Sequence, residues 1–369
     1  MKNILYLGNY KDNNGFGQSC RRYLDWLISH KKFNVAARPL YVTNSSVAPP
    51  IKDDVYSEFE NLSNKNYDTI IQNTYPEYIE YHKEFGKNIA IVEIETNNIK
   101  HSGWIDKLNT MDEIWVGSLF SAQSLINGGV FKTIKIVPEP YDISKYNQDY
   151  DCFFSYDTSN KPFIFYTMGQ YTEKKNIKNI ILAYLLEFKK KDNVRLFIKT
   201  CDHRQKNEDL ENLIKFDMRQ IKNMLRKNED DYPDVDVLCG YLADKDVVRL
   251  HRSCDCYVNS VRGDGFGSSA IESAICGKSI INTKNIGSST YFNSTNSLML
   301  NASNCAVMSS NSIFRNVYTI YEQWFDPSIV DLRKNMRSIM TMTASNRNQL
   351  NDNFIAQTFD YTNIDSIVL

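Results

Sequence analysis

Short apolar runs alternate with longer amphipathic patterns along almost the whole chain of 369 residues. Parallel sheets with helices on both faces produce this alternation, because buried strands read as apolar runs and the crossovers between them as helices. The predicted strands are Ile4–Leu7, Thr69–Gln72, Ile89–Ile94, Glu113–Val116, Ile134–Val137, Phe163–Met168, Val194–Lys199, Val235–Cys239, Cys256–Ser260 and Ser279–Asn282. The predicted helices are Gln18–Ser29, Phe120–Asn127, Ile177–Lys190, Glu208–Lys227, Asp244–Ser253, Ser268–Cys276 and Ile313–Phe325.

A polar stretch from Pro138 to Pro162 interrupts the alternation and is typical of a linker. Since a domain usually has ~100–200 residues, we expect two α/β domains, residues 1–145 and 160–345. Each is predicted to be a doubly wound, Rossmann-like sheet. Ligands of such sheets bind at the carboxyl ends of the strands, so two sheets facing each other would form an interdomain cleft.

The composition argues against several classes of function. The net charge is −1, from 43 basic and 44 acidic residues, so electrostatics do not favour nucleic acid or an anionic membrane as the main partner. No apolar run approaches the ~18 residues of a transmembrane helix, and the opening M-K-N-I-L-Y-L-G-N-Y is expected to form a strand rather than a signal peptide. The eight cysteines include no C-x-x-C pair, which indicates reduced cysteines in a cytoplasmic protein.

The stretch Arg262–Gly277, R-G-D-G-F-G-S-S-A-I-E-S-A-I-C-G, carries the most specific chemical pattern. Its glycine-rich turn precedes a predicted helix, whose first N–H groups can point at a bound anion. Asp264 and Glu272 flank the turn, and ionised carboxylates accept hydrogen bonds from hydroxyl groups. Together these features indicate a phosphorylated sugar or nucleotide. Ser269 and Glu272 also have the spacing of a capping box, which is a structural alternative for the glutamate.

Gly15 and Gly17 lie in the loop after the first predicted strand, immediately before Gln18 and Ser19 of the predicted helix. Their N–H groups could meet phosphate oxygens, although a polar surface loop explains the same residues. The third glycine of the dinucleotide-binding fingerprint is absent, which disfavours a nicotinamide enzyme.

Two further strand ends carry candidate binding residues. Lys174 and Lys175 lie where a predicted strand passes into a helix, and a lysine at that edge can neutralise a diphosphate. The alternative is a solvated lysine pair. Gly240 and Tyr241 form the turn before a helix that we expect Asp244 to cap, and this turn could hold a base or be an ordinary strand–helix connection.

Taken together, these segments resemble retaining glycosyltransferases of family 4, which have the GT-B fold. The resemblance rests on four segments: Gly169 with Lys175-Asn176, Gly240-Tyr241, D-C-Y-V-N-S, and R-G-D-G-F-G-S-S-A-I-E-S-A-I-C-G-K-S-I-I. The run from D-E-I-W-V-G-S to I-V-P-E-P-Y-D resembles the family's approach to its interdomain linker more loosely. In this fold the last helix typically returns to the first domain, which we expect here for residues 346–369.

The resemblance implies a role for each matching residue. Glu272 would bind the ribose hydroxyls of the donor nucleotide, Asp264 the hydroxyls of the transferred sugar, and Lys175 the diphosphate. The remaining donor-binding candidates are the backbone amides of Phe266, Gly267 and Ser268, the base-side loop Gly240–Tyr241, and Gly15 and Gly17 from the other domain.

The sequence departs from the family pattern at several positions. Asp264 replaces the usual glutamate and is one methylene shorter, and Lys278-Ser279 replaces the common x-Pro. Gln170 stands where many members have an arginine, and Lys174 is the candidate to supply the missing charge. His101 is the candidate for the catalytic histidine of the first domain, with a solvated loop histidine as the alternative.

The resulting prediction is a metal-independent glycosyltransferase without a cofactor, which moves a sugar from a UDP-, GDP- or ADP-sugar to a glycan, lipid or protein acceptor. No nucleic-acid partner is expected, and the protein is expected in the cytoplasm, with peripheral membrane association left open. Two alternatives remain. One is a nucleotide-sugar-binding protein with little transfer activity, motivated by Gln170 and Asp264, and the other is a sugar epimerase of the same fold.

Overall fold

The computed structural model describes residues 2–41, 55–63, 66–154, 160–202, 205–307, 318–350 and 354–368. The chain divides into two compact units. The first unit contains Met1–Asp142, Ser310–Gln323 and Gln357–Leu369, and the second contains Ile143–Ser309 and Trp324–Ala356. The first crossing between units therefore falls at Asp142, inside the polar stretch where the alternation of strands and helices breaks.

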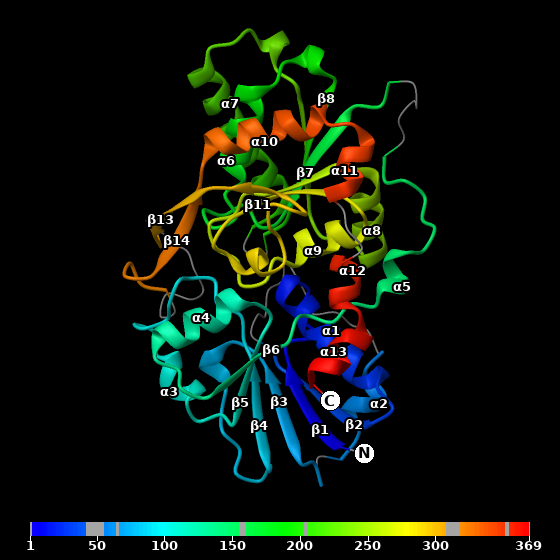
Figure 1. Cartoon of the computed structure of the whole chain (residues 1–369), viewed down its shortest axis with the longest axis vertical. Coiled ribbons are helices and arrows are strands. Elements are labelled where there is room, and N and C mark those ends of the chain that lie inside the picture. The colour runs from blue at the N-terminus through cyan, green and yellow to red at the C-terminus, as the bar shows by residue number, and fades with distance from the viewer. Residues whose placement is uncertain are drawn as a thin grey trace. The chain divides into compact units, whose positions relative to one another are not determined.

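The first unit is built on a parallel sheet of six strands in the order β2-β1-β3-β4-β5-β6 (Figure 1). The strands are β1 (Lys2–Gly8), β2 (Phe33–Pro39), β3 (Thr69–Asn73), β4 (Lys87–Ile91), β5 (Glu113–Val116) and β6 (Thr133–Ile136). The connecting helices are α1 (Gly15–Ser29), α2 (Ser57–Glu60), η1 (Pro76–Tyr78), α3 (Trp104–Leu108) and α4 (Leu119–Gly128). This strand order is one of the two common doubly wound arrangements.

A helix from the far end of the chain completes the core of the first unit. In α13 (Tyr361–Val368), Ile364 is fully buried among residues of β1 and α1. The neighbouring Asp365 accepts a hydrogen bond of 2.8 Å from the indole of Trp26 and pairs at 3.0 Å with His30. The last described helix therefore packs on the first helix of the chain.

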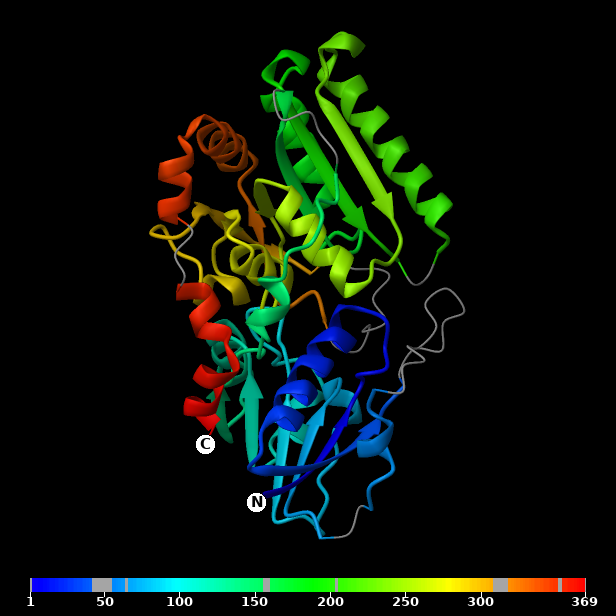
Figure 2. The ribbon, with the colours of Figure 1, turned by 90° about the vertical axis from the view of Figure 1, so that its right-hand side faces the viewer.

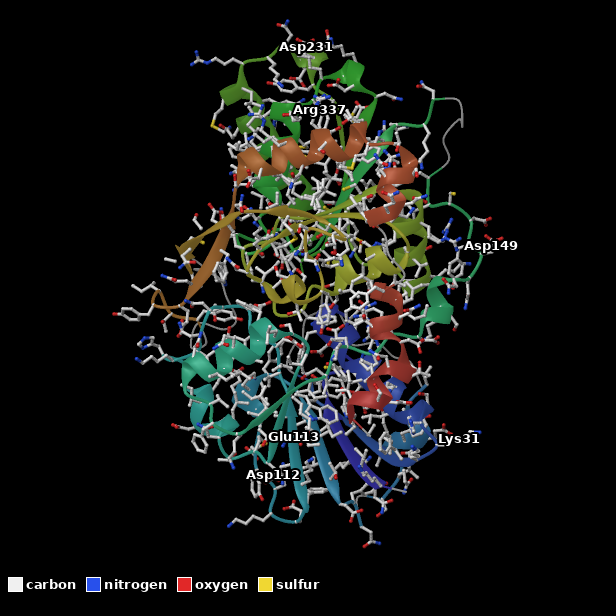
Figure 3. The ribbon with its side chains drawn as sticks, in the orientation of Figure 1. Lys31, Asp112, Glu113, Asp149, Asp231 and Arg337 are labelled. Carbon is white, nitrogen blue, oxygen red and sulfur yellow. The ribbon has the colours of Figure 1, made fainter. Side chains whose placement is uncertain are left out.

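Glu113 of β5, labelled in Figure 3, links its strand to the neighbouring strands β4 and β6. Its carboxylate lies 2.9 Å from Nζ of Lys87 on β4 and 3.2 Å from Nζ of Lys135 on β6, and it accepts a 2.6 Å hydrogen bond from the indole of Trp115. Burial alone would raise the pKa of Glu113, but these three donors outweigh it and lower the pKa. The ionised side chain of Glu113 therefore connects β4, β5 and β6.

The second unit has a parallel sheet of six strands in the order β12-β11-β10-β7-β8-β9. These are β7 (Phe163–Met168), β8 (Val194–Thr200), β9 (Asp234–Cys239), β10 (Cys256–Asn259), β11 (Ser279–Thr283) and β12 (Leu298–Leu300). Counted within the unit, this is the order 6-5-4-1-2-3 of the Rossmann fold, with the reversal between β7 and β10. In a separate two-stranded sheet, β13 (Ala302–Ala306) pairs with β14 (Gln323–Pro327).

The second unit has several helices, and Figure 2 shows the longest described one, α7, in light green beside β9. Its helices are α5 (Ile143–Tyr146), α6 (Ile177–Glu187), η3 (Lys190–Asp192), α7 (Asn207–Leu225), η4 (Glu229–Asp231), α8 (Asp244–Ser253), α9 (Ser268–Ile275), η5 (Gly287–Thr290), α10 (Ile329–Thr341) and α11 (Ala344–Leu350), and the boundary between the two units falls within α12 (Phe354–Phe359). Apolar side chains of α6, such as Ile180 and Ile181, are fully buried against β7, β8 and α10. Arg337 of α10, labelled in Figure 3, bonds to the carboxylate and carbonyl of Glu187 at the end of α6.

The structure differs from the sequence prediction at several elements. The strand β2 was not predicted, and α1 begins at Gly15 rather than at Gln18. The predicted helix Ile313–Phe325 is wrong over its described part, since residues 318–322 form a turn and Gln323 begins β14; residues 313–317 lie outside the described residues. Hydrogen bonds from Phe325 N to the Arg262 carbonyl and between Gln323 and Asn97 replace the helical ones.

Within the described ranges, no helix combines the length and the apolar character that crossing a bilayer requires.

Candidate nucleotide-sugar site

The loops that follow β7 and β10 meet at the point where the strand order of the second sheet reverses. The two strands pair directly, with Cys256 opposite Phe165 and Tyr257 opposite Tyr166. Open α/β sheets bind ligands at the carboxyl ends of strands at such a point. The first of these loops carries Lys175, and the second carries Asp264, so the fold brings together two residues that are 89 positions apart in the chain.

Lys175 and Asp264 form a short ion pair, with 2.6 Å between Nζ and Oδ2. The other carboxylate oxygen of Asp264 accepts a 3.2 Å hydrogen bond from the backbone N–H of Phe266. Burial opposes ionisation of Asp264, but the lysine charge and these hydrogen bonds lower its pKa. Asp264 is therefore an ionised residue that organises the start of the glycine-rich turn.

The turn packs tightly against the start of η5, and this packing explains one glycine on each side of the contact. Gly267 caps α9 with φ +93°, a conformation that favours glycine, and a Cβ there would lie 2.6 Å from Cβ of Ser288. Across the contact, a Cβ on Gly287 would lie 1.9 Å from the Gly265 carbonyl oxygen. The Gly287 N–H also bonds to the Asp264 carbonyl at 2.7 Å. The amino end of α9 is thus held by backbone contacts that exclude side chains.

The capping-box interpretation of Glu272 is wrong. The residue at the N-cap of α9 is Gly267, which has no side chain, so Ser269 lies inside the helix and Glu272 in its second turn. Likewise Asp244 is the first residue of α8 rather than its cap, which is Ala243. A glycine with positive φ ends the loop two residues earlier than the capping-box spacing assumes.

Glu272 is buried and held by side chains from two other elements. Its Oε1 accepts a 3.4 Å hydrogen bond from the hydroxyl of Tyr146 on α5, and its Oε2 lies 3.3 Å from Nε2 of His251 on α8. Figure 1 shows α8 beside α9. Sequence reasoning missed both partners. The only signal for His251 was its place on the apolar face of a predicted amphipathic helix, which is a weak one.

The remaining candidates of the second unit lie around the same sheet edge. Gln170 and Lys174 are partly buried in the loop after β7, where the Lys174 carbonyl accepts a bond from the Arg262 N–H. Gly240 follows β9 with φ +126°. The ring of Tyr241 lies 6.0 Å from Nζ of Lys199, and burial raises the pKa of its hydroxyl to about 12. Ser268 begins α9 directly after the cap.

The candidate site residues of the first unit are two glycines at the start of α1 and a histidine in the loop after β4. Gly15 is the first residue of α1, whose cap Asn14 accepts a 2.8 Å hydrogen bond from the Gly17 N–H. Gly17 lies so close to the preceding loop that a Cβ would be 2.1 Å from the Asp12 carbonyl oxygen. His101 is exposed after β4, and its ring centroid is 4.9 Å from that of Tyr321.

A comparison with known protein families finds a match for most of the second unit. Residues 151–304 match the sequence model of the family described as Glycosyl transferases group 1. This part of the chain is therefore similar to group 1 glycosyltransferases. The matched residues include Lys175, the Gly240–Tyr241 turn, Asp264 and Glu272. A comparison with curated protein sequences finds no match.

Solved glycosyltransferase structures share the fold of the whole chain. HepE from Anabaena in complex with UDP and glucose aligns at 14% identity and TM-score 0.61, covering 99% of this chain and 98% of HepE. Sucrose-phosphate synthase from Thermosynechococcus elongatus aligns at 12% identity and TM-score 0.64, over 99% and 96% of the two chains. An E. coli trehalose-6-phosphate protein bound with UDP-2-fluoro glucose aligns at 10% identity and TM-score 0.65, over 98% and 97%. The chain therefore has a GT-B-like α/β fold.

Proposed function

We propose that this protein is a retaining, family 4-like glycosyltransferase that moves a sugar from a nucleoside diphosphate sugar to a glycan, lipid or protein acceptor. The observation that carries the proposal is the Lys175–Asp264 pair beside the glycine-capped start of α9, at the strand reversal of a unit that is similar to group 1 glycosyltransferases. UDP-sugars are the first donors to test, because two of the similar structures contain UDP with glucose or a UDP-glucose analogue.

In the proposed reaction, the bond between the anomeric carbon and the diphosphate breaks as the acceptor hydroxyl oxygen forms its new bond on the same face, and the hydroxyl proton passes to the departing diphosphate. Negative charge develops on the departing diphosphate, and a preorganised cation stabilises it. Lys175 would supply that charge, and the amino end of α9 would add its backbone dipole. Asp264 would hold Lys175 in place before the donor binds and accept hydroxyls of the sugar, while Glu272 would bind the ribose.

The short ion pair also favours a second candidate function. Because Asp264 already compensates the charge of Lys175 at 2.6 Å, and Gln170 adds no charge, the site offers a diphosphate less net positive charge than a lysine–arginine pair would. A protein that binds the nucleotide sugar but transfers it slowly would have such a site.

A donor screen followed by product analysis tests both candidates. Thermal unfolding is measured with UDP-, GDP- and ADP-sugars, since a ligand of the native state raises the apparent stability. We expect one nucleotide class to raise Tm, and a labelled sugar from it to reach an acceptor with its anomeric configuration retained. Stabilisation without transfer across glycan, lipid and peptide acceptors identifies the binding protein. Absence of stabilisation by every donor overturns both.

Removal of divalent metal tests the proposed source of charge stabilisation. If Lys175 and the helix dipole neutralise the diphosphate, an excess of EDTA leaves the transfer rate within about twofold. A loss of activity in EDTA that Mg²⁺ or Mn²⁺ restores would contradict the metal-independent mechanism.

A further inference from the structure

Three polar side chains lie behind Glu272 in the interior of the second unit. His251 of α8, Tyr166 of β7 and Ser273 of α9 are each fully buried. Nδ1 of His251 lies 2.8 Å from the Tyr166 hydroxyl and 2.9 Å from Oγ of Ser273. On the opposite side of the same ring, Nε2 of His251 faces Oε2 of Glu272 at 3.3 Å. The histidine therefore connects the glutamate to a buried pair of hydroxyl groups.

The hydroxyl protons of this cluster can be assigned by counting donors. Oγ of Ser273 lies 2.6 Å from the Ser269 carbonyl oxygen, which has no hydrogen, so the serine must donate its proton there. The Tyr166 hydroxyl retains its proton because burial raises its pKa far above the usual value. Within the triangle of Tyr166, Ser273 and Nδ1, the tyrosine is therefore the hydroxyl with a proton to donate, and the acceptors within reach are Nδ1 at 2.8 Å and Oγ of Ser273 at 2.9 Å.

In the proposed function Glu272 accepts hydrogen bonds from ribose hydroxyls, which calls for its ionised form, and this form fixes the other end of the ring. A carboxylate has only acceptor oxygens, so a bare Nε2 lone pair facing it at 3.3 Å would be repulsive. A proton on Nε2 gives a complete chain of donors, in which Tyr166 donates to Nδ1 and Nε2–H donates to Glu272. The carboxylate thus selects the tautomer of His251, and the hydroxyl on the far side of the ring is compatible with it.

We propose that His251 is a positioning residue for Glu272, holding its carboxylate in the orientation that receives the donor nucleotide, with Tyr166 fixing the donating tautomer. The inference rests on the proposed function, in which Glu272 binds the ribose hydroxyls. Other groups beside Glu272 include Tyr146 of α5 and Cys276, the residue that ends α9 one turn further along. His251 is the one among them that connects Glu272 to a buried donor chain.

The burial of the cluster supports a positioning role. A buried polar network is costly unless its donors and acceptors are matched, and apolar residues of similar volume often replace one without loss of stability. The ring of Tyr257 packs beside the cluster, with its centroid 5.1 Å from that of Tyr166 and 6.5 Å from that of His251. A matched donor chain that ends on a carboxylate orients that carboxylate, as partners of metal ligands do.

Two substitutions of His251 distinguish a role in orienting Glu272 from a role in filling space in the core. His251→Phe keeps a ring and removes the donor, and His251→Gln keeps an N–H donor near the position of Nε2. We expect His251→Phe to raise the donor KM and the nucleotide Kd by about 10-fold or more, as for loss of a hydrogen bond to a charged group, with kcat within about threefold. We expect His251→Gln to restore most of the affinity. Ser253→Ala is the control on α8, because its hydroxyl contacts Phe153 N and the Arg249 carbonyl, away from Glu272.

The results distinguish this inference from the proposed function. If the wild-type protein binds no nucleoside diphosphate sugar, the proposed function and the inference both fail. If the wild-type protein binds a donor and His251→Phe has an unchanged donor KM, only the inference fails. Should His251→Phe not fold, Tyr166→Phe decides in its place, with a rise of about threefold or more in donor KM expected and no change contradicting the proposal.

A measurement on the wild-type protein without ligand tests the proton assignment. In a ¹H–¹⁵N spectrum of the imidazole groups, we expect the His251 resonance to show a protonated Nε2. A spectrum with a bare Nε2 would overturn the inference, because the glutamate would then have no donor from the ring.

Discussion

At the scale of single residues, the ion pair between Lys175 and Asp264 carries the proposed chemistry. Both side chains are largely shielded from solvent, and the pair is short, so the lysine is fixed near the amino end of α9 before any ligand arrives. Preorganised charge of this kind needs no rearrangement as the leaving group departs.

Replacing Lys175 by alanine removes this charge. We expect kcat to fall by about 100- to 1000-fold, the range seen when one group that stabilises a developing anion is removed, while circular dichroism shows a folded protein. Lys178→Ala is the matched control, since Lys178 on the next turn forms an exposed pair with Asp217. Equal rates for the Lys175 variant and the wild-type protein would remove Lys175 from the mechanism.

Asp12, in the loop before α1, predicts a pH-dependent stability. Burial raises its pKa from 3.8 to about 6, although a hydrogen bond from Asn9 and the charge of Arg21 act in the opposite direction. Its Oδ1 is buried without a hydrogen-bond partner in the part of the chain that the structure describes. Because the raised pKa means that the unfolded state loses its proton first, the contribution of Asp12 to stability falls as the pH rises from about 4 to 6.

Asp12→Asn should therefore stabilise the protein in a pH-dependent manner. We expect the gain in free energy of unfolding to grow from roughly 1 kcal/mol at pH 4.5 to roughly 3 kcal/mol at pH 7.5, measured by urea denaturation. Asp68→Asn, at an exposed position of the same unit, should show no such trend. A gain that does not change with pH would show that Asp12 is ionised throughout this range.

At the scale of elements, the site depends on how closely two loops approach each other. A backbone hydrogen bond joins the glycine turn before α9 to the first residue of η5. The contact leaves no room for Cβ atoms at Gly267 and Gly287. The position of the helix start, and of the N–H groups that would face a phosphate, follows from this contact.

Gly267→Ala tests this packing. We expect a loss of about 2–3 kcal/mol in the free energy of unfolding, from the positive φ and the contact with Ser288 together, and a clear rise in donor Kd. Gly277→Ala, beyond the other end of α9, has φ +70° and no atom within 4 Å of the added Cβ. It should lose only about 1 kcal/mol and bind the donor normally. Similar losses of donor affinity in both variants would contradict a specific role for the turn.

Some elements of the fold could be predicted from the sequence, and others could not. Buried strands such as β7 are largely apolar runs and could be predicted directly. The helix predicted over Ile313–Phe325 is wrong over its described residues, because its apolar spacing is also compatible with a turn and with a strand that pairs with β13. The GT-B-like fold and the similarity to group 1 glycosyltransferases were predictable, because the motif Asp264–Gly277 is local. The contacts of His251 with Glu272 and Tyr166 were not, because they join three elements that only the fold brings together.

At the scale of the whole molecule, the first unit is built from both ends of the chain, because the chain returns to it after forming the second unit. Ile364 of α13 is buried in the core that contains Tyr6 and Trp26, more than 300 residues earlier. Asp365 adds polar contacts to Trp26 and His30. The stability of the first unit therefore depends on residues that the sequence order places after the second.

Two isoleucines of α13 measure this dependence. Ile364→Ala should lower the free energy of unfolding by about 2–4 kcal/mol, as expected for a cavity in a core. Ile367→Ala, at a side chain that is 39% exposed on the same helix, should lower it by less than about 1 kcal/mol. Urea unfolding followed by tryptophan fluorescence gives both values. Equal effects would mean that α13 is not part of the core in solution.

Because α13 packs on the first helix of the chain, the core of the first unit can be completed only after α13 has been synthesised. The last strand of the first sheet ends at Ile136, and Ile364 leaves the ribosome about 230 residues later, which takes roughly 10–50 s at common translation rates. During that interval the nascent chain exposes the apolar surface of α1 that Ile364 will cover, while the second unit can already fold. Substitutions that weaken α13 should therefore reduce the yield of native protein during synthesis more than they reduce the stability of the finished molecule.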